Sequence, residues 1–188
     1  AADRALSFRI RPSADRSVGN QTQLATANIS HGYGTLAGLD MEQQQAIETT
    51  VCIAGGGPAG MVLGYLLARA GIEVTVLEKH ADFLRDFRGD TVHPSTLQII
   101  QDCGLWSAFE ALPQQREQML SAKIGSRLQP VIDFRGLEPF DYLAFVPQWH
   151  FLDLFADAGA GLPDFDLRMG HEVTGLIREG DQIRGVHA

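Results

Sequence analysis

The chain has 188 residues, enough for one domain with its own core, and its 45% hydrophobic and 20% charged content is ordinary for globular proteins. A net charge of −8 without a basic stripe argues against nucleic acid as a partner. Cys52 and Cys103 are isolated from each other in the sequence. They predict neither a metal site nor a disulfide framework, and they fit a reducing cytoplasm.

Residues 1–40 differ in amino-acid composition from the rest of the chain. They are rich in Ser, Thr, Asn, Gln and Gly, and their apolar residues follow no sustained period. This composition predicts disorder, and no apolar signal-peptide core stands near the start. Residue 1 is Ala, whereas Met41 stands shortly before the first clear strand signal. We therefore expect residues 1–40 to be a disordered or non-native leader and residues 41–188 to carry the folded domain.

The first elements predicted in the folded part form a strand, a helix and a second strand. The apolar run Val51–Ala54 is typical of a buried parallel strand, and Met61–Ala70 predicts a helix that Gly71 ends. A second strand follows over 73–77, so the two strands should be adjacent and parallel. The uncharged stretch 51–68 is barely long enough to span a membrane, but glycines and a proline break it, so we expect no span.

The turn between the first strand and the helix reads Gly-Gly-Gly-Pro-Ala-Gly and matches the pattern G-x-G-x-x-G. Gly55 permits the tight turn, Gly57 lets backbone approach a pyrophosphate, and Gly60 allows close packing of helix and strand. Pro58 suits the first helical turn, whose N–H groups and dipole attract phosphate. Glu78 follows Gly60 by 18 positions, near the offset of a carboxylate that accepts from ribose hydroxyls. The stretch predicts a dinucleotide-binding site.

The rest of the chain alternates helices with short strands. Apolar spacing and glycines predict three helices, over 93–102, 105–112 and 149–158. Segments 119–128 and 131–134, separated by Gln129-Pro130, predict a hairpin or a meander. A short strand is expected at 166–169, and a second hairpin at 172–177 and 182–186. The fold class is therefore α/β.

Five stretches of the chain, taken together, carry a resemblance to a known family: GGGPAG, VLEK, RDFRGDTVHPSTLQII, VPQWHFLDLF and LRMGHEVTGLI. They resemble the FAD-dependent aromatic hydroxylases, the single-component flavoprotein monooxygenases of the p-hydroxybenzoate hydroxylase type. The resemblance extends from about residue 48 to the last residue. GGGPAG is shared by many flavoproteins, whereas RGDTVHPSTL is more specific to this group.

The resemblance implies a Rossmann-like FAD/NAD(P)-binding domain whose first βαβ unit holds the ADP half of FAD. It implies that Arg88 reaches the FAD phosphates and that Gln148 approaches the flavin. No catalytic residue and no metal ligand is expected in this segment. The cofactor-binding residues implied are Gly55, Gly57, Pro58, Ala59, Gly60, Glu78, Lys79, Arg88 and Gln148.

The activity implied is that of an oxidoreductase. The flavin, reduced by NAD(P)H, activates O2 and hydroxylates a small phenolic substrate. Family members continue past a hairpin like the one over 172–186 into segments that complete the FAD site. We therefore expect this chain to be the N-terminal portion of the FAD-binding domain, incomplete at its C-terminus and inactive alone. The substrate, the choice between NADH and NADPH, and the oligomeric state stay open.

Two other functions are compatible with the same glycine motif. An NAD-dependent reductase would share GGGPAG and Glu78, but it would not need the RGDTVHPSTL helix. A non-catalytic nucleotide-binding remnant would need no flavin. The absorption spectrum of the purified protein distinguishes these alternatives, because only the flavoprotein shows oxidised-flavin bands.

Overall fold

The computed structural model describes residues 6–11, 46–84 and 91–188. Its centre is a parallel sheet of three strands in the order β10-β4-β3, with bounds Phe165–Met169, Val74–Glu78 and Val51–Ala54. Every residue of the middle strand β4 is buried. Such a strand needs apolar side chains on both faces, which the run Val-Thr-Val-Leu largely supplies. The predicted parallel pairing of the first two strands is confirmed, with Val51 opposite Val74.

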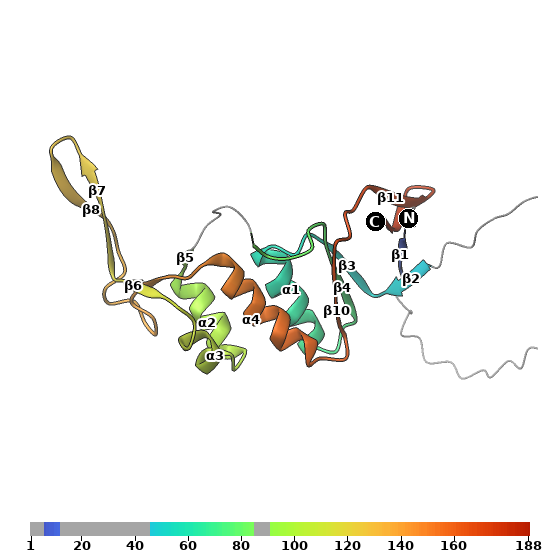
Figure 1. Cartoon of the computed structure of the whole chain (residues 1–188), viewed down its shortest axis with the longest axis horizontal. Helices are drawn as coiled ribbons and strands as arrows, with labels where there is room; N and C mark the ends of the chain where they lie inside the picture. Colours follow the sequence, from blue (N-terminus) through green and yellow to red (C-terminus); the bar gives the residue numbers. More distant parts are fainter. Residues whose placement is uncertain (1–5, 12–45, 85–90) are drawn as a thin grey trace, which may run out of the picture.

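Helix α1 (Pro58–Arg69) connects β3 to β4 and packs on the sheet beside α4 (Gln148–Ala160) (Figure 1). Its buried positions are Met61, Gly64, Tyr65 and Ala68, one stripe of a helix. A Cβ on Gly64 would lie 2.7 Å from Cγ2 of Val76, so this glycine sets how closely the helix approaches β4. The helix ends at Gly71, whose φ of +74° is the left-handed conformation expected there.

A second sheet has the order β11-β12-β1-β2, and it corrects the prediction for the leader. Its bounds are Gly175–Glu179, Gln182–His187, Ser7–Ile10 and Ala46–Thr49. Strand β1 runs antiparallel to β12 and parallel to β2, so residues 6–11 are not a disordered leader. Phe8 is wholly buried against Leu77 and Val186, and this burial fixes the short strand. The rest of the predicted leader lies outside the described residues.

Between β4 and α4, the described residues form two helices and a small three-stranded sheet, besides the hairpin described below. The helices are α2 (Pro94–Asp102) and α3 (Trp106–Glu110). The sheet has the order β5-β9-β6, over Thr91–Val92, Leu143–Phe145 and Gln115–Glu117. Together with α4, the helices α2 and α3 account for the three helices predicted after the first βαβ unit. Their apolar residues join those of α1 and the parallel sheet in one continuous core.

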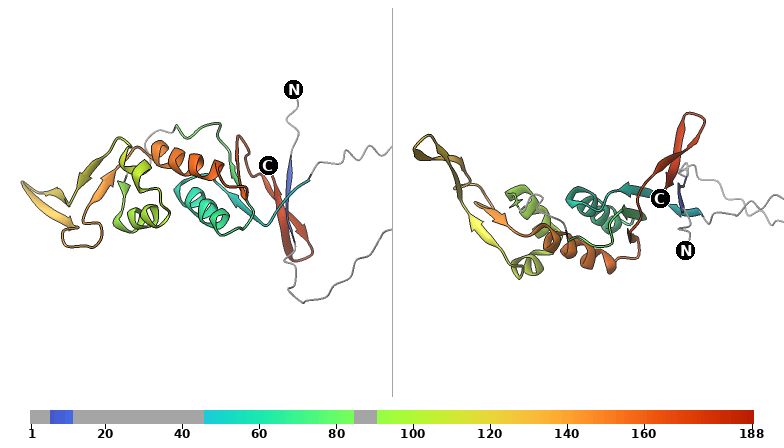
Figure 2. Two further views of the ribbon diagram at one scale, coloured as in Figure 1. Left: turned by 90° about the horizontal axis from the view of Figure 1, so that it is seen from below. Right: turned by 45° about the horizontal axis from the view of Figure 1, so that its top comes forward.

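The hairpin β7–β8 (Met119–Ile124, Arg127–Asp133) extends from the body of the molecule (Figures 1 and 2). The hairpin was predicted, but the predicted break at Gln129-Pro130 is wrong. Pro130 lies within β8 opposite Ser121, and the turn is at Gly125, whose φ is +63°. A two-stranded hairpin has free edges, where a residue without an N–H is tolerated.

Candidate functional site

The glycine turn leaves β3 at its carboxyl end and leads directly into α1. Gly55 has a φ of +109°, and its N–H donates to the carbonyl of Leu77 at 2.7 Å, which ties the turn to the end of β4. A Cβ on Gly60 would lie 2.0 Å from the carbonyl oxygen of Gly55, so no side chain fits there. A Cβ on Gly57 would meet nothing within 4 Å. The turn is therefore closed on the side of Gly60 and open in front of Gly57.

The space in front of the turn is a depression of about 430 Å³. It borders the first turn of α1, whose leading N–H groups have no partner within a helix and carry the positive end of its dipole. Such a helix start favours an anion such as a pyrophosphate. A pyrophosphate therefore fits this surface. The depression is lined by Ile53, Ala54, Gly55, Gly57, Pro58, Ala59, Gly60 and Leu63.

Glu78 ends β4 beside the glycine turn, and it is 8% exposed. Its Oε2 accepts a hydrogen bond from the N–H of Gly56 at 2.9 Å. Its Oε1 accepts from the N–H of His80 at 3.0 Å and lies 2.5 Å from Nδ1 of the same residue. The structure thus joins the predicted carboxylate to the predicted turn across 22 positions of sequence.

A second depression, of about 260 Å³, lies over Glu78. Lys79 and His80 border it from the segment after β4, and His171 borders it from the segment after β10. The N–H of His171 donates to the carbonyl of Glu78 at 2.8 Å, which holds the two segments together. A hydroxyl-rich ligand group fits beside a carboxylate in such a place. The lining residues are Ala54, Gly55, Leu77, Glu78, Lys79, His80, His171, Glu172 and Val173.

Gln148 is the first residue of α4 and lines a third, smaller depression of about 90 Å³ together with Pro58. The structure thus places Gln148 beside Pro58, at the start of α1, and its approach to the flavin stays a prediction. Thr91, Thr96 and Val146 complete much of the wall. Arg88, the predicted phosphate ligand, lies outside the described residues.

The three depressions adjoin one another. Gly55 lines both the depression over Glu78 and the one in front of the glycine turn. Pro58 lines both the latter and the one beside Gln148. The predicted residues that the structure describes are therefore arranged in series along the carboxyl ends of the parallel strands, where open α/β sheets bind ligands.

Sequence reasoning missed three residues of this site. Gly56 donates to Glu78, and a Cβ there would lie 2.9 Å from that of Glu78. His80 contacts the same carboxylate, and His171 was assigned no role although it lines the depression. The one available signal was position: Gly56 lies inside the glycine motif, and His80 follows the strand-end acid by two residues.

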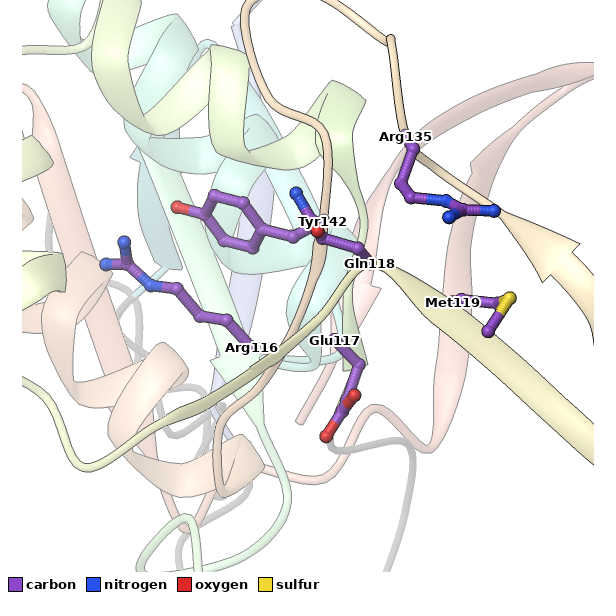
Figure 3. Close-up of a pocket in the computed structure, with 6 residues that line it drawn as sticks. All are labelled: Arg116, Glu117, Gln118, Met119, Arg135 and Tyr142. Atoms are coloured by element: carbon purple, nitrogen blue, oxygen red, sulfur yellow. The ribbon is translucent and has the colours of Figure 1, made fainter.

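A larger depression, of about 570 Å³, lies at the base of the β7–β8 hairpin and contains none of the predicted residues (Figure 3). Its arginines already have partners. The guanidinium of Arg135 donates two hydrogen bonds to Asp133, at 2.9 and 2.6 Å, and its backbone N–H donates a third at 3.0 Å; together they hold the pKa of that carboxyl at about 2. Arg116 lies alongside the ring of Tyr142, 4.8 Å from its centroid (Figure 3). None of its lining residues begins a described helix, and we assign it no ligand.

The described residues near the site indicate neither a reactive thiol nor a metal centre. Cys52, in β3, is half-buried, and burial raises the pKa of its thiol, which disfavours the reactive thiolate. Within residues 6–11, 46–84 and 91–188, no three His, Cys, Asp or Glu side chains come together as metal ligands would. None of the helices in this described part combines the length and apolar character needed to cross a membrane.

Comparison with known proteins identifies relatives for most of the chain. Residues 48–188 match the family described as FAD binding domain. The chain is 30% identical over 139 residues to 6-methylpretetramide 4-monooxygenase from Streptomyces rimosus, covering 73% of this chain and 33% of that protein. It is 36% identical over 103 residues to tryptophan 2-halogenase from Chondromyces crocatus, covering 55% of this chain and 19% of that protein.

The fold of this chain is also similar to that of a solved structure. The OxyS anhydrotetracycline hydroxylase from Streptomyces rimosus has a TM-score of 0.59 and 32% identity, with 71% of this chain and 26% of that chain covered. The chain thus spans a third or less of the length of these relatives. Strand β1 lies outside the range that the family matches.

Proposed function

The chain belongs to the FAD binding domain family of flavin-dependent aromatic hydroxylases, its cofactor is FAD, and we propose how its residues hold that cofactor. The pyrophosphate lies in front of Gly57, against the first turn of α1. The adenosine ribose donates its hydroxyls to Glu78. The isoalloxazine end extends past Pro58 toward Gln148.

The observation that carries this proposal is the series of three adjoining depressions, linked by Gly55 and Pro58. An elongated dinucleotide needs a carboxylate, a phosphate-binding turn and a polar side chain in that order. The order in space is Glu78, Gly57 and Gln148. Lys79 borders the ribose end, and we expect Arg88 to approach the phosphates as the family resemblance implies.

The reaction that we propose is hydroxylation of a small phenolic compound with NAD(P)H and O2. FAD, when bound, supplies the chemistry of oxygen activation, and the residues of this chain bind and orient it. The relative from Streptomyces rimosus is named as a monooxygenase of 6-methylpretetramide, which supports an aromatic substrate class. We propose a cytoplasmic setting, because Cys52 and Cys103 are both free thiols.

We expect the 188-residue chain alone not to hydroxylate a phenol. Its matches span a third or less of their relatives, and the depressions in front of the glycine turn and over Glu78 are open at the surface. Hydroxylation needs an enclosed site from which water is excluded. An oxygen-electrode assay with added FAD, NADH or NADPH and a panel of phenols tests this, and stoichiometric hydroxylated product would contradict it.

Other functions receive less support. A tryptophan halogenase is among the relatives, but this chain has only two tryptophans and lacks the tryptophan-rich motif of that group. An NAD-dependent reductase accounts for Glu78 but not for Gln148 beside the start of α1. A non-catalytic nucleotide-binding remnant predicts a colourless protein, without the absorption bands of oxidised flavin.

Replacement of Gly57 by Val tests the phosphate site. The side chain would enter the open space in front of the turn, where no protein atom lies within 4 Å of the Cβ. We expect affinity for FAD and ADP to fall at least about tenfold, equivalent to about 1.4 kcal/mol, in a titration by calorimetry. Gly161→Val is the matched control, because its Cβ meets only the carbonyl of Ala158 at 3.6 Å, far along α4. Equal affinity in the two variants would refute the assignment.

A further inference from the structure

His80 stands out among the residues around the depression over Glu78. It lies on the segment that follows β4, and its side chain is 44% exposed, whereas that of Glu78 is 10% exposed. The imidazole therefore stands at the mouth of the depression while the carboxylate lies inside it. Sequence motifs of dinucleotide sites assign a role to the acid at the strand end but none to a residue two positions later.

The carboxylate of Glu78 is held from two sides. Its Oε1 receives both the backbone N–H of His80, at 3.0 Å, and the ring Nδ1 of His80, at 2.5 Å. Its Oε2 receives the N–H of Gly56 at 2.9 Å. Two donors on one oxygen and one on the other fix the rotation of the carboxylate plane, and hydrogen bonds to a charged group are stronger than neutral ones.

Chemistry sets the tautomer of the imidazole. A carboxylate oxygen only accepts, so Nδ1 of His80 carries the proton in this contact. His171, the other histidine of the depression, cannot replace it, because its Nδ1 is 2.9 Å from the carbonyl of Met169. Its ring also packs edge-on against Phe8, at 6.1 Å between centroids.

We propose that His80 is a positioning residue for ribose recognition: it orients the carboxylate of Glu78 so that its oxygens meet the ribose hydroxyls. The proposal rests on the proposed function, since it presumes that Glu78 accepts from a nucleotide ribose. Loss of the imidazole removes one of these three donors and leaves the two backbone N–H groups, so the carboxylate is held less firmly. Recognition of the ribose hydroxyls then weakens, while recognition of the pyrophosphate by the glycine turn is unchanged.

A pair of ligands that differ in one ribose hydroxyl separates these effects. The 188-residue chain is titrated by calorimetry with ADP and with 2′-deoxy-ADP. Because a hydrogen bond to a charged group is involved, we expect the wild-type chain to prefer ADP by about tenfold. In His80→Ala this preference should fall below about threefold, because the acceptor is oriented less firmly by the two remaining backbone donors. A merely structural role of His80 would weaken both ligands equally and leave the ratio unchanged.

Two further variants complete the test. His80→Asn keeps an N–H donor near the position of Nδ1 and should retain the preference for ADP. His187→Ala removes an exposed histidine that lines none of the three depressions and should behave as wild type. An unchanged preference in His80→Ala overturns the role of His80 and leaves the ribose site intact. A wild-type chain that binds both ligands equally, or binds neither, overturns the ribose site and with it this proposal.

Discussion

The clearest consequence of the glycine turn is that two of its glycines are needed for different reasons. A Cβ on Gly60 would lie 2.0 Å from the carbonyl oxygen of Gly55, more than about 1 Å short of van der Waals contact. Both atoms belong to backbone, so the start of α1 must move away from the turn. Overpacking of this kind costs about 3 kcal/mol. For a domain of this size we expect Gly60→Ala to lower the Tm by about 6–12 °C.

Gly57→Ala is the matched substitution in the same turn. Gly57 has a φ of −74° and a ψ of −179°, which any residue adopts, and its Cβ would meet nothing within 4 Å. We expect a loss of at most about 1 kcal/mol, because alanine is a poorer helix cap than glycine. Thermal unfolding followed by far-UV circular dichroism compares the two variants. An equal Tm for Gly60→Ala and Gly57→Ala would refute the assignment of separate structural and ligand-facing roles.

Two further predictions concern the N-terminal strand and the effect of pH. Phe8→Ala should lower the free energy of unfolding by about 3 kcal/mol, because the ring is wholly buried. Arg9→Ala removes only an exposed ion pair and should cost about 0.5 kcal/mol. Denaturant unfolding measures both, and equal costs would mean that β1 does not join the core. Arg135 lowers the pKa of Asp133 to about 2, so its stabilising effect is present above about pH 4 and is lost as pH falls through 2. In Arg135→Ala, an NMR titration should find the pKa of Asp133 raised toward 3.8, and an unchanged pKa would contradict the assignment.

The central βαβ unit could be predicted from sequence because its signals are local. The apolar strand, the glycine turn and Gly71 at the helix end lie within one stretch, and each has one structural meaning. The nearness of Glu78 to the turn was also predictable. Glu78 ends the strand beside the one that leads into the turn, and parallel strands end at the same edge of a sheet. The position of Gln148 near this edge came from the family resemblance and not from a local pattern.

Strand β1 could not be predicted in this way. It has four residues, too few to show a period, and its partner β12 follows more than 170 positions later. The polar composition of the first forty residues predicted disorder, although Phe8 lies among them and is completely buried in the fold. Close approach of β1 to β12 also depends on Gly185, where a Cβ would lie 1.9 Å from the carbonyl oxygen of Phe8. Nothing in the sequence near either segment indicates this complementarity.

The position of the hairpin turn was predicted wrongly, and the contact of His80 was not predicted, for other reasons. Pro130 was interpreted as a break, but an edge strand accepts a proline, and Gly125 supplies the left-handed residue of the actual turn. The contact between His80 and Glu78 depends on a bend after β4 that no periodicity specifies. Such contacts require three-dimensional information even when both residues lie close together in the chain.

The most direct test of the account is a titration of the ¹⁵N-labelled 188-residue chain with ADP, followed residue by residue in amide NMR spectra. We predict saturable shifts at the amides of Gly56, Gly57, Ala59 and Gly60, with a second group around Glu78 and His80. The depression at the base of the β7–β8 hairpin, lined by Arg116 and Tyr142, should show none. Shifts confined to that depression, or no saturable shift at the glycine turn, would contradict the placement of the cofactor's ADP half.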